Sequence, residues 1–126
     1  MLIAYGKSPD DCIKCPACQG GHIHHDTVTI FDRKAEDAPS YALVVERGGC
    51  VSNITGARAE QDNPSSRRHG VAIRFWCEEC DTISELAVEQ HKGSTRLRWR
   101  AAEGHYSPNT KCDEPPLLSI IRRFGQ

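Results

Sequence analysis

The sequence predicts a mainly β protein whose strands form an antiparallel sheet, with a short helix near the C-terminus. Three observations support this fold class. Several stretches alternate apolar and polar residues with the period of two that a strand requires. Turn-forming residues separate these stretches, as at Lys92-Gly93. Near the end of the chain, the apolar period changes to that of a helix.

The length and composition of the chain set the size of its core. At 126 residues the chain is expected to form a single domain, 1–126. Hydrophobic residues make up 38% and aromatic residues 6%, so packing alone provides a small core. A metal ion that joins distant segments would therefore add useful stability. The formal net charge of −1 excludes an overall positive field, so any contact with nucleic acid must come from a local basic surface.

The first two strands are expected on either side of a polar loop at residues 33–40. In the first, Val28 and Ile30 share one face, and in the second, residues 41–47, both faces are apolar, which is typical of a central strand. Residues 48–70 lose all periodicity and collect Gly, Asn, Pro and Ser, so they are predicted to be a long loop, and such loops are usually either mobile or functional. The expected strands cover residues 22–32, 41–47, 71–76, 82–90 and 95–100.

The last two strands form a predicted hairpin whose register can be derived from the sequence. A two-residue turn at Lys92-Gly93 and a four-residue loop 91–94 give the same pairings. One face of the hairpin is then apolar and the other carries opposite charges, while Arg98 faces Ala87 and lacks an acidic partner. The register pairs Val88 with Leu97, Leu86 with Trp99, Glu89 with Arg96, and Glu85 with Arg100.

A short amphipathic helix is expected over residues 113–125. Its apolar residues follow the spacing i, i+3, i+4, i+7, two prolines stand near its start, and Gly125 follows its last turn. A helix of about ten residues does not hold itself together in water, so its apolar face must dock on this domain or on a partner. The residues of that face are Leu117, Ile120, Ile121 and Phe124.

Two C-x-x-C pairs, Cys15 with Cys18 and Cys77 with Cys80, supply what a tetrahedral Zn²⁺ requires. Each pair places two thiols on a tight turn, and the glycines after the first pair are expected to adopt positive φ and to turn backbone amides toward its thiolates. Four thiolates leave no open coordination position, so one structural Zn²⁺ is predicted. Cys12 could replace Cys15 in a shifted pair.

Cys50 and Cys112 are expected to pack as small apolar residues. An odd number of cysteines and the lack of an apolar signal segment favour a soluble protein of the reducing cytoplasm, without a membrane partner.

The two cysteine motifs, C-P-A-C-Q-G-G at residue 15 and F-W-C-E-E-C at residue 75, resemble those of a zinc ribbon. In that family the two turns that carry the cysteines face each other across β-hairpins and hold Zn²⁺ with four thiolates. The segment between the motifs is longer than a zinc ribbon usually has, which implies an inserted β-subdomain. The stretch 85–99 also resembles small bacterial and mobile-element proteins, and this resemblance implies no function.

A second cluster, H-x-H-H-D at His22, His24, His25 and Asp26, invites comparison with the H-x-H-x-D-H metal site of metallo-hydrolases. The match is incomplete, because the last histidine of that pattern would fall at Thr27, or at Val28 if the aspartate is shifted. These residues are therefore interpreted as the polar start of a strand, and one histidine could donate a hydrogen bond to a thiolate. A metallo-hydrolase using His22, His24 and Asp26 is the alternative.

Basic residues on the long loop and on the hairpin suggest contacts with phosphate. They could equally form a solvated face whose charges are paired. The leading hypothesis is a non-enzymatic module that binds nucleic acid, and no small-molecule substrate is expected. The alternative is a protein–protein adaptor or inhibitor that uses a sheet edge or the C-terminal helix. The candidate phosphate contacts are Arg67, Arg68, Lys92, Arg96, Arg98 and Arg100.

Overall fold

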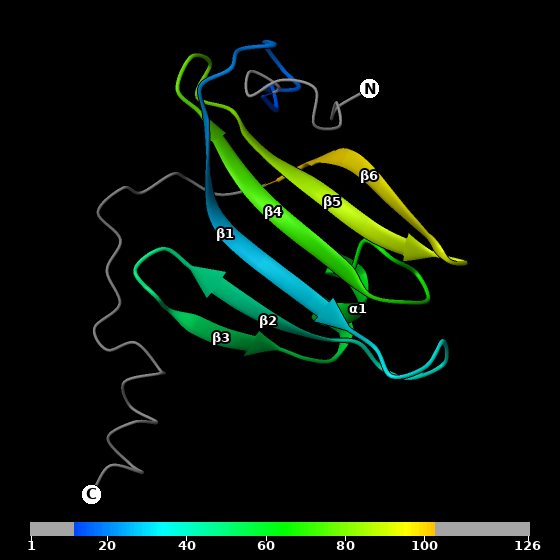
Figure 1. Cartoon of the computed structure of the whole chain (residues 1–126). Helices are drawn as coiled ribbons and strands as arrows, with labels where there is room; N and C mark the ends of the chain where they lie inside the picture. The colour runs from blue at the N-terminus through cyan, green and yellow to red at the C-terminus, as the bar shows by residue number, and fades with distance from the viewer. Residues whose placement is uncertain (1–11, 103–126) are drawn as a thin grey trace, which may run out of the picture.

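The computed structural model describes residues 12–102, which fold into one antiparallel sheet and one short helix. The strands lie in the order β3-β2-β1-β4-β5-β6 (Figure 1). The predicted mainly β, antiparallel fold class is confirmed, and the predicted helix at 113–125 lies outside the described residues. The elements are β1 (Ile23–Asp32), β2 (Tyr41–Glu46), β3 (Val51–Ile54), α1 (Ala57–Asp62), β4 (Gly70–Cys77), β5 (Ile83–His91) and β6 (Ser94–Ala101).

The segment between the two cysteine motifs contains β1, β2, β3, α1 and β4. Strands β2 and β3 extend the sheet beyond β1, on the side away from β5 and β6. The prediction of a loop throughout residues 48–70 is therefore wrong, because both β3 and α1 form there. β3 is only four residues long and includes two polar residues, and α1 is only six residues long, so neither is long enough to show a period in the sequence.

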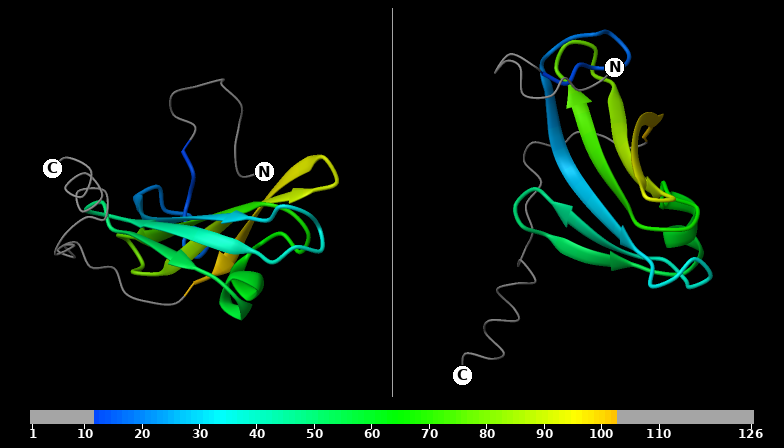
Figure 2. Two further views of the ribbon diagram at one scale, coloured as in Figure 1. Left: turned by 90° about the horizontal axis from the view of Figure 1, so that it is seen from below. Right: turned by 45° about the vertical axis from the view of Figure 1, so that its right-hand side comes forward.

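The described core lies between the sheet and α1. Phe31, Ala42 and Ala72 are buried in it, and Ile54 of β3 packs against them. Helix α1 covers this face of the sheet (Figure 2), and its Ala59 is fully buried. Most of the buried apolar side chains are small, which agrees with the modest hydrophobic content of the sequence.

Helix α1 is too short to be stable alone and is fixed by its Glu60. One carboxylate oxygen of Glu60 lies 3.0 Å from Nη2 of the buried Arg33, and the other accepts a hydrogen bond from the backbone amide of Ser40. The Arg33 guanidinium also donates to the carbonyl of Ala38 at 3.2 Å. The loop between β1 and β2 and the helix therefore stabilise each other.

The β5–β6 hairpin has the predicted register in full. Leu86 pairs with Trp99 and Glu85 with Arg100, and the turn is formed by Lys92 (φ 46°) and Gly93 (φ 83°). Two successive residues with positive φ match the right-handed twist of the flanking strands, which explains the Gly at the second position. Among the described residues, no helix is long and apolar enough to cross a membrane.

Candidate metal centre

The two C-x-x-C turns lie next to each other at the end of the sheet where β1 begins and β4 ends (Figure 1). They have the same backbone hydrogen bonds. The amide of Cys15 donates to the carbonyl of Gly20, as that of Cys77 does to Thr82. The amide of the residue after each pair donates to the carbonyl of its first cysteine, at 2.9 Å in both turns. The two turns therefore have the same backbone structure, as in a zinc-ribbon-like site.

Each turn contains a residue in the left-handed region directly after its second cysteine. These are Gln19 (φ 65°) and Asp81 (φ 60°). The expectation that the glycines of the first turn adopt this conformation is wrong. Gly20 is required for another reason, because a Cβ atom there would stand 1.7 Å from Oε2 of Glu79 and 3.2 Å from Sγ of Cys18. A side chain at this position would collide with the opposite turn.

The four predicted sulfur atoms converge, and all lie within 4.8 Å of one another. Sγ of Cys15 is 3.7 Å from that of Cys80, and Sγ of Cys18 is 3.6 Å from that of Cys77. A tetrahedron with metal–sulfur bonds of about 2.3 Å has sulfur–sulfur edges of about 3.8 Å, whereas a disulfide bond is about 2.0 Å long. The geometry therefore fits a metal ion held by four thiolates.

Burial and local hydrogen bonds prepare the thiols to bind a cation. Cys15 and Cys77 are 1% exposed, and the amides of Ala17 and Gly20 point at Sγ of Cys15 and Cys18, both at 3.4 Å. Burial raises the pKa of Cys77, whereas hydrogen bonds from the Thr82 hydroxyl and amide lower the pKa of Cys80 to about 6. Thiols this close do not all ionise unless a cation offsets their charges, so this donor set suits a divalent metal.

The pKa of Cys18 illustrates this mutual effect of the thiols. The backbone amide of Gly20 acts to lower this pKa, but desolvation and hydrogen bonds with the other three thiols raise it to about 12. Cys18 therefore needs a bound cation to become a thiolate near neutral pH.

The histidines beside this centre bind the glutamates of the second turn. Nδ1 of His22 lies 2.9 Å from Glu79, and Nε2 of His24 lies 3.1 Å from Glu78. The hydrogen bond to Glu79, reinforced by the charges of both glutamates, raises the pKa of His22 above its ordinary value. The sequence contained both partners, but nothing in it indicated that residues so far apart would pair.

The remaining members of the H-x-H-H-D cluster have other neighbours. The ring of His25 meets Phe75 edge to face, and Asp26, at the bulge in β1, lies 3.8 Å from Nε of Arg74. Within residues 12–102, the four cysteines are the group that could hold a metal ion, and His22, His24 and Asp26 are not brought together.

The other described cysteines differ from the four at the centre. Cys12 has a free, exposed thiol and is not part of the cluster, so Cys15 rather than Cys12 stands with Cys18. Cys50 is disulfide-bonded, and the expectation that it packs as a small apolar residue is wrong.

Half of the predicted phosphate contacts are already engaged within the protein. Arg68 pairs with Glu36 at 3.1 Å, and Arg100 pairs with Glu85, as predicted, and donates to the carbonyl of Asp62 at 2.7 Å. Arg98 donates to the carbonyl of Pro64 at 3.5 Å. Arg100 therefore holds the end of α1, and Arg98 the loop that follows it, against β6, a role that the sequence did not indicate. Arg67, Lys92 and Arg96 are exposed and form no ion pair among the described residues.

The fold and the site together define a class: a mainly β protein with a zinc-ribbon-like group of four cysteines that could hold a metal ion. Comparison with protein-family models, with curated proteins and with solved structures finds no match to this chain.

Proposed function

We propose that this protein is a non-enzymatic binding module, stabilised by one structural Zn²⁺, and that its ligand is nucleic acid. Zn²⁺ is proposed because thiolates favour soft metals and because four sulfurs on two C-x-x-C turns are a common structural zinc site. With four thiolates the metal has no open position for a substrate. A binding surface is therefore sought away from the metal.

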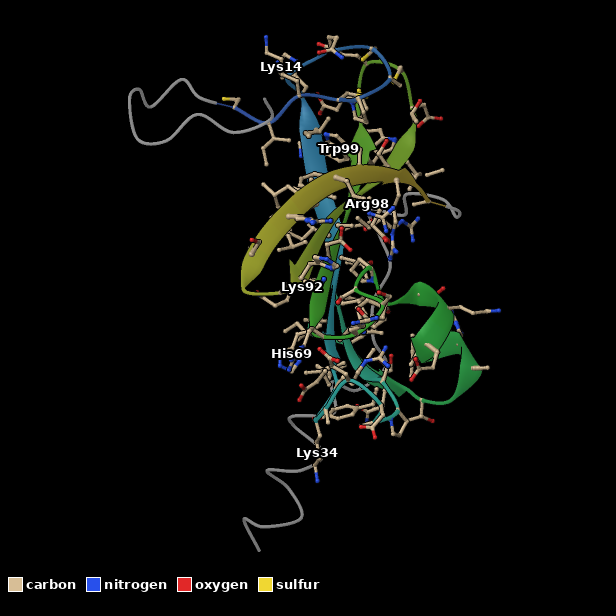
Figure 3. All side chains as sticks on the ribbon, turned by 90° about the vertical axis from the view of Figure 1, so that its right-hand side faces the viewer. Lys14, Lys34, His69, Lys92, Arg98 and Trp99 are labelled. Atoms are coloured by element: carbon tan, nitrogen blue, oxygen red, sulfur yellow. The ribbon has the colours of Figure 1, made fainter. Side chains whose placement is uncertain are left out.

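The observation that carries the proposal is the attachment of residues 63–69, which we call the basic loop, to the β5–β6 hairpin. The Ser65 hydroxyl donates to the carbonyl of Gln90 at 2.8 Å, and the Gln90 amide donates to the carbonyl of His69 at 3.1 Å. These two bonds hold the loop that carries Arg67 against Gln90. Gln90 lies near the end of β5, two residues before Lys92 (Figure 3). We call the exposed cations Arg67, Lys92 and Arg96 the basic end of the sheet.

The basic loop is built rigidly, which favours a role in binding. Ser65 is 2% exposed, and its hydroxyl accepts hydrogen bonds from the amides of Arg67 and Arg68 at 3.4 and 2.9 Å. The buried Asn63 side chain accepts from the Ser65 amide at 2.9 Å and donates to the Arg68 carbonyl at 3.1 Å. Preorganised cations lose less conformational entropy when they meet phosphates.

The number of free cations sets the expected salt dependence. Each neutralised phosphate of duplex DNA contributes about −0.9 to the slope of log affinity against log salt, so three contacts predict a slope of about −2 to −3. We expect Arg67→Gln and Arg96→Gln each to flatten the slope by about 1. The measurement is fluorescence anisotropy with labelled duplex and single-stranded oligonucleotides over a range of salt concentrations.

Arg58→Gln is the matched control. Arg58 is exposed and basic and lies on α1. Its replacement by Gln changes the net charge by the same amount as Arg67→Gln or Arg96→Gln. Arg58→Gln should leave the slope unchanged. Absence of binding to DNA and RNA at low salt would overturn the proposal, as would equal effects of all three variants, which would indicate non-specific attraction.

A further inference from the structure

The face of the sheet opposite α1 carries continuous apolar rows. Directly paired residues on neighbouring antiparallel strands share a face, so the register joins side chains across five strands. One row runs across β2, β1, β4, β5 and β6 as Leu43, Ile30, Val71, Val88 and Leu97. The next row, two residues along each strand, is Val45, Val28, Ile73, Leu86 and Trp99. We call these ten residues the open face.

Of the ten residues of the open face, three are exposed and six are half-buried, whereas Leu86 is only 3% exposed. Ile30, Leu43 and Leu97 are 47%, 37% and 40% exposed, and Tyr41, beside Leu43 on β2, is 47% exposed. Helix α1 lies on the other face of the sheet (Figure 2). That other face is different in character, because its cleft of about 630 Å³ is lined by charged residues such as Arg58 and Glu85.

The area of the open face is sufficient for the apolar centre of an interface. At strand spacings of about 4.8 Å and about 6.8 Å between alternate residues, ten positions occupy roughly 330 Å² of sheet, before side-chain relief is counted. The largest exposed apolar patch of a typical soluble monomer is about 300–600 Å² and is often functional. A standard interface of about 800 Å² per partner consists of such an apolar centre within a polar rim.

We propose that the open face binds the open face of a second copy of this chain, so that two sheets pack face to face in a symmetric dimer. The ten residues include no charged side chain, so like charges do not oppose each other across a two-fold axis. Face-to-face packing at about 10 Å is the usual way in which two apolar sheet faces are buried. The basic end of each copy is not part of the open face, so the dimer and nucleic-acid binding are compatible.

A helix from the same chain is a less suitable cover. The amphipathic segment predicted at 113–125 would form a helix about 20 Å long and 10 Å wide, and about 200 Å² of cover leaves more than a third of the open face uncovered. A β-sheet surface of equal size and character covers it completely. The second copy is therefore the occupant that the dimensions favour.

The test is the mass of the zinc-loaded full chain in solution, measured by sedimentation equilibrium over a range of protein concentrations. The expected result is twice the chain mass of 14.0 kDa. Leu43→Lys places a charge in the open face and is expected to give a monomer. Ser52→Lys, at an exposed position facing the α1 side on the neighbouring strand, is the matched control and should leave the dimer intact.

A second measurement on the wild-type chain covers the case in which Leu43→Lys fails to fold. Nuclear Overhauser effects between differently labelled copies should connect the methyl groups of Ile30, Leu43 and Leu97 across the interface. A monomeric wild type would overturn the proposal, whether the methyl groups then contact residues 113–125 or solvent. A dimer that survives Leu43→Lys and shows no such contacts would overturn it too, because its interface would lie elsewhere.

Discussion

At the scale of single residues, Asp32 shows how side chains secure the end of the sheet away from the metal. Its carboxylate accepts a hydrogen bond from the Tyr41 hydroxyl at 2.6 Å and lies 2.8 Å from Nδ1 of His69. The bond from Tyr41, with smaller contributions from the Arg33 amide and His69, holds the pKa of Asp32 below its ordinary 3.8. The same bond raises the pKa of Tyr41 above 10.0. The pair joins β1 to β2.

Replacing Tyr41 with Phe should raise the pKa of Asp32 toward its ordinary value. Because the folded-state pKa of Asp32 is depressed, its carboxylate contributes stability that is present above the unfolded pKa and is lost as pH falls through the folded pKa. Tyr41→Phe should therefore be less stable than wild type at neutral pH, with the difference shrinking in acid. NMR titration of Asp32 and denaturant unfolding at several pH values measure both effects. An unchanged Asp32 titration in Tyr41→Phe would show that the hydrogen bond does not cause the shift.

The sequence identified the residues of the metal centre better than their surroundings. The spacing within each C-x-x-C pair is local, so the four cysteines could be chosen without knowing the fold. The bonds from His22 to Glu79 and from His24 to Glu78 are not local, and they depend on β1 pairing with β4. The left-handed conformation of Gln19 was also missed, because glycines follow it directly and are the usual residues for that conformation.

At the scale of structural elements, the loop from Asn63 to His69 depends on the glycine that begins β4. A Cβ atom at Gly70 would stand 2.6 Å from Cγ of Pro64 and 2.7 Å from Oδ1 of Asn63. Asn63 cannot yield easily, because it is buried and its amide nitrogen donates to the Ser40 hydroxyl at 2.8 Å. The position of Arg67 is thus linked to a close contact at Gly70.

Gly70→Ala should displace this loop. Overpacking of this kind typically costs about 1–3 kcal/mol in the free energy of unfolding, and the displaced Arg67 should weaken binding to nucleic acid. Gly21→Ala is the control, since a Cβ atom there meets nothing within 4 Å. Urea unfolding measures the change in the free energy of unfolding, and the anisotropy measurement described above measures the change in binding to nucleic acid. If Gly70→Ala matched wild type in both, the close contact would have no role in placing Arg67.

Predictability from sequence differed between elements for physical reasons. The β5–β6 hairpin could be derived to register, because a short turn and alternation on both strands allow few alternatives. β3 and α1 could not, because with four and six residues they are too short to show a period in the sequence. Strand β3 pairs with β2, and α1 is fixed by Glu60 to residues of the loop between β1 and β2.

At the scale of the whole molecule, the metal centre and the basic end lie at opposite ends of the sheet. β4 runs from Gly70, beside the basic loop, to Cys77 of the metal centre. β5 runs back to Gln90, which is hydrogen-bonded to the basic loop. A metal that joins the two turns closes a long loop of the chain, and structural zinc contributes on the order of 10 kcal/mol or more to folding. Since the buried apolar side chains of residues 12–102 are few and mostly small, the metal should be essential for stability.

The zinc content of the purified full chain tests the central claim most directly. Elemental analysis is carried out on the wild type, on Cys77→Ser and on Cys12→Ser as the control, since Cys12 is exposed and outside the cluster. We predict one zinc per chain in the wild type and in Cys12→Ser, and loss of zinc together with the fold in Cys77→Ser. Zinc retained in Cys77→Ser, or lost in Cys12→Ser, would contradict the assignment of Cys15, Cys18, Cys77 and Cys80 as the metal site.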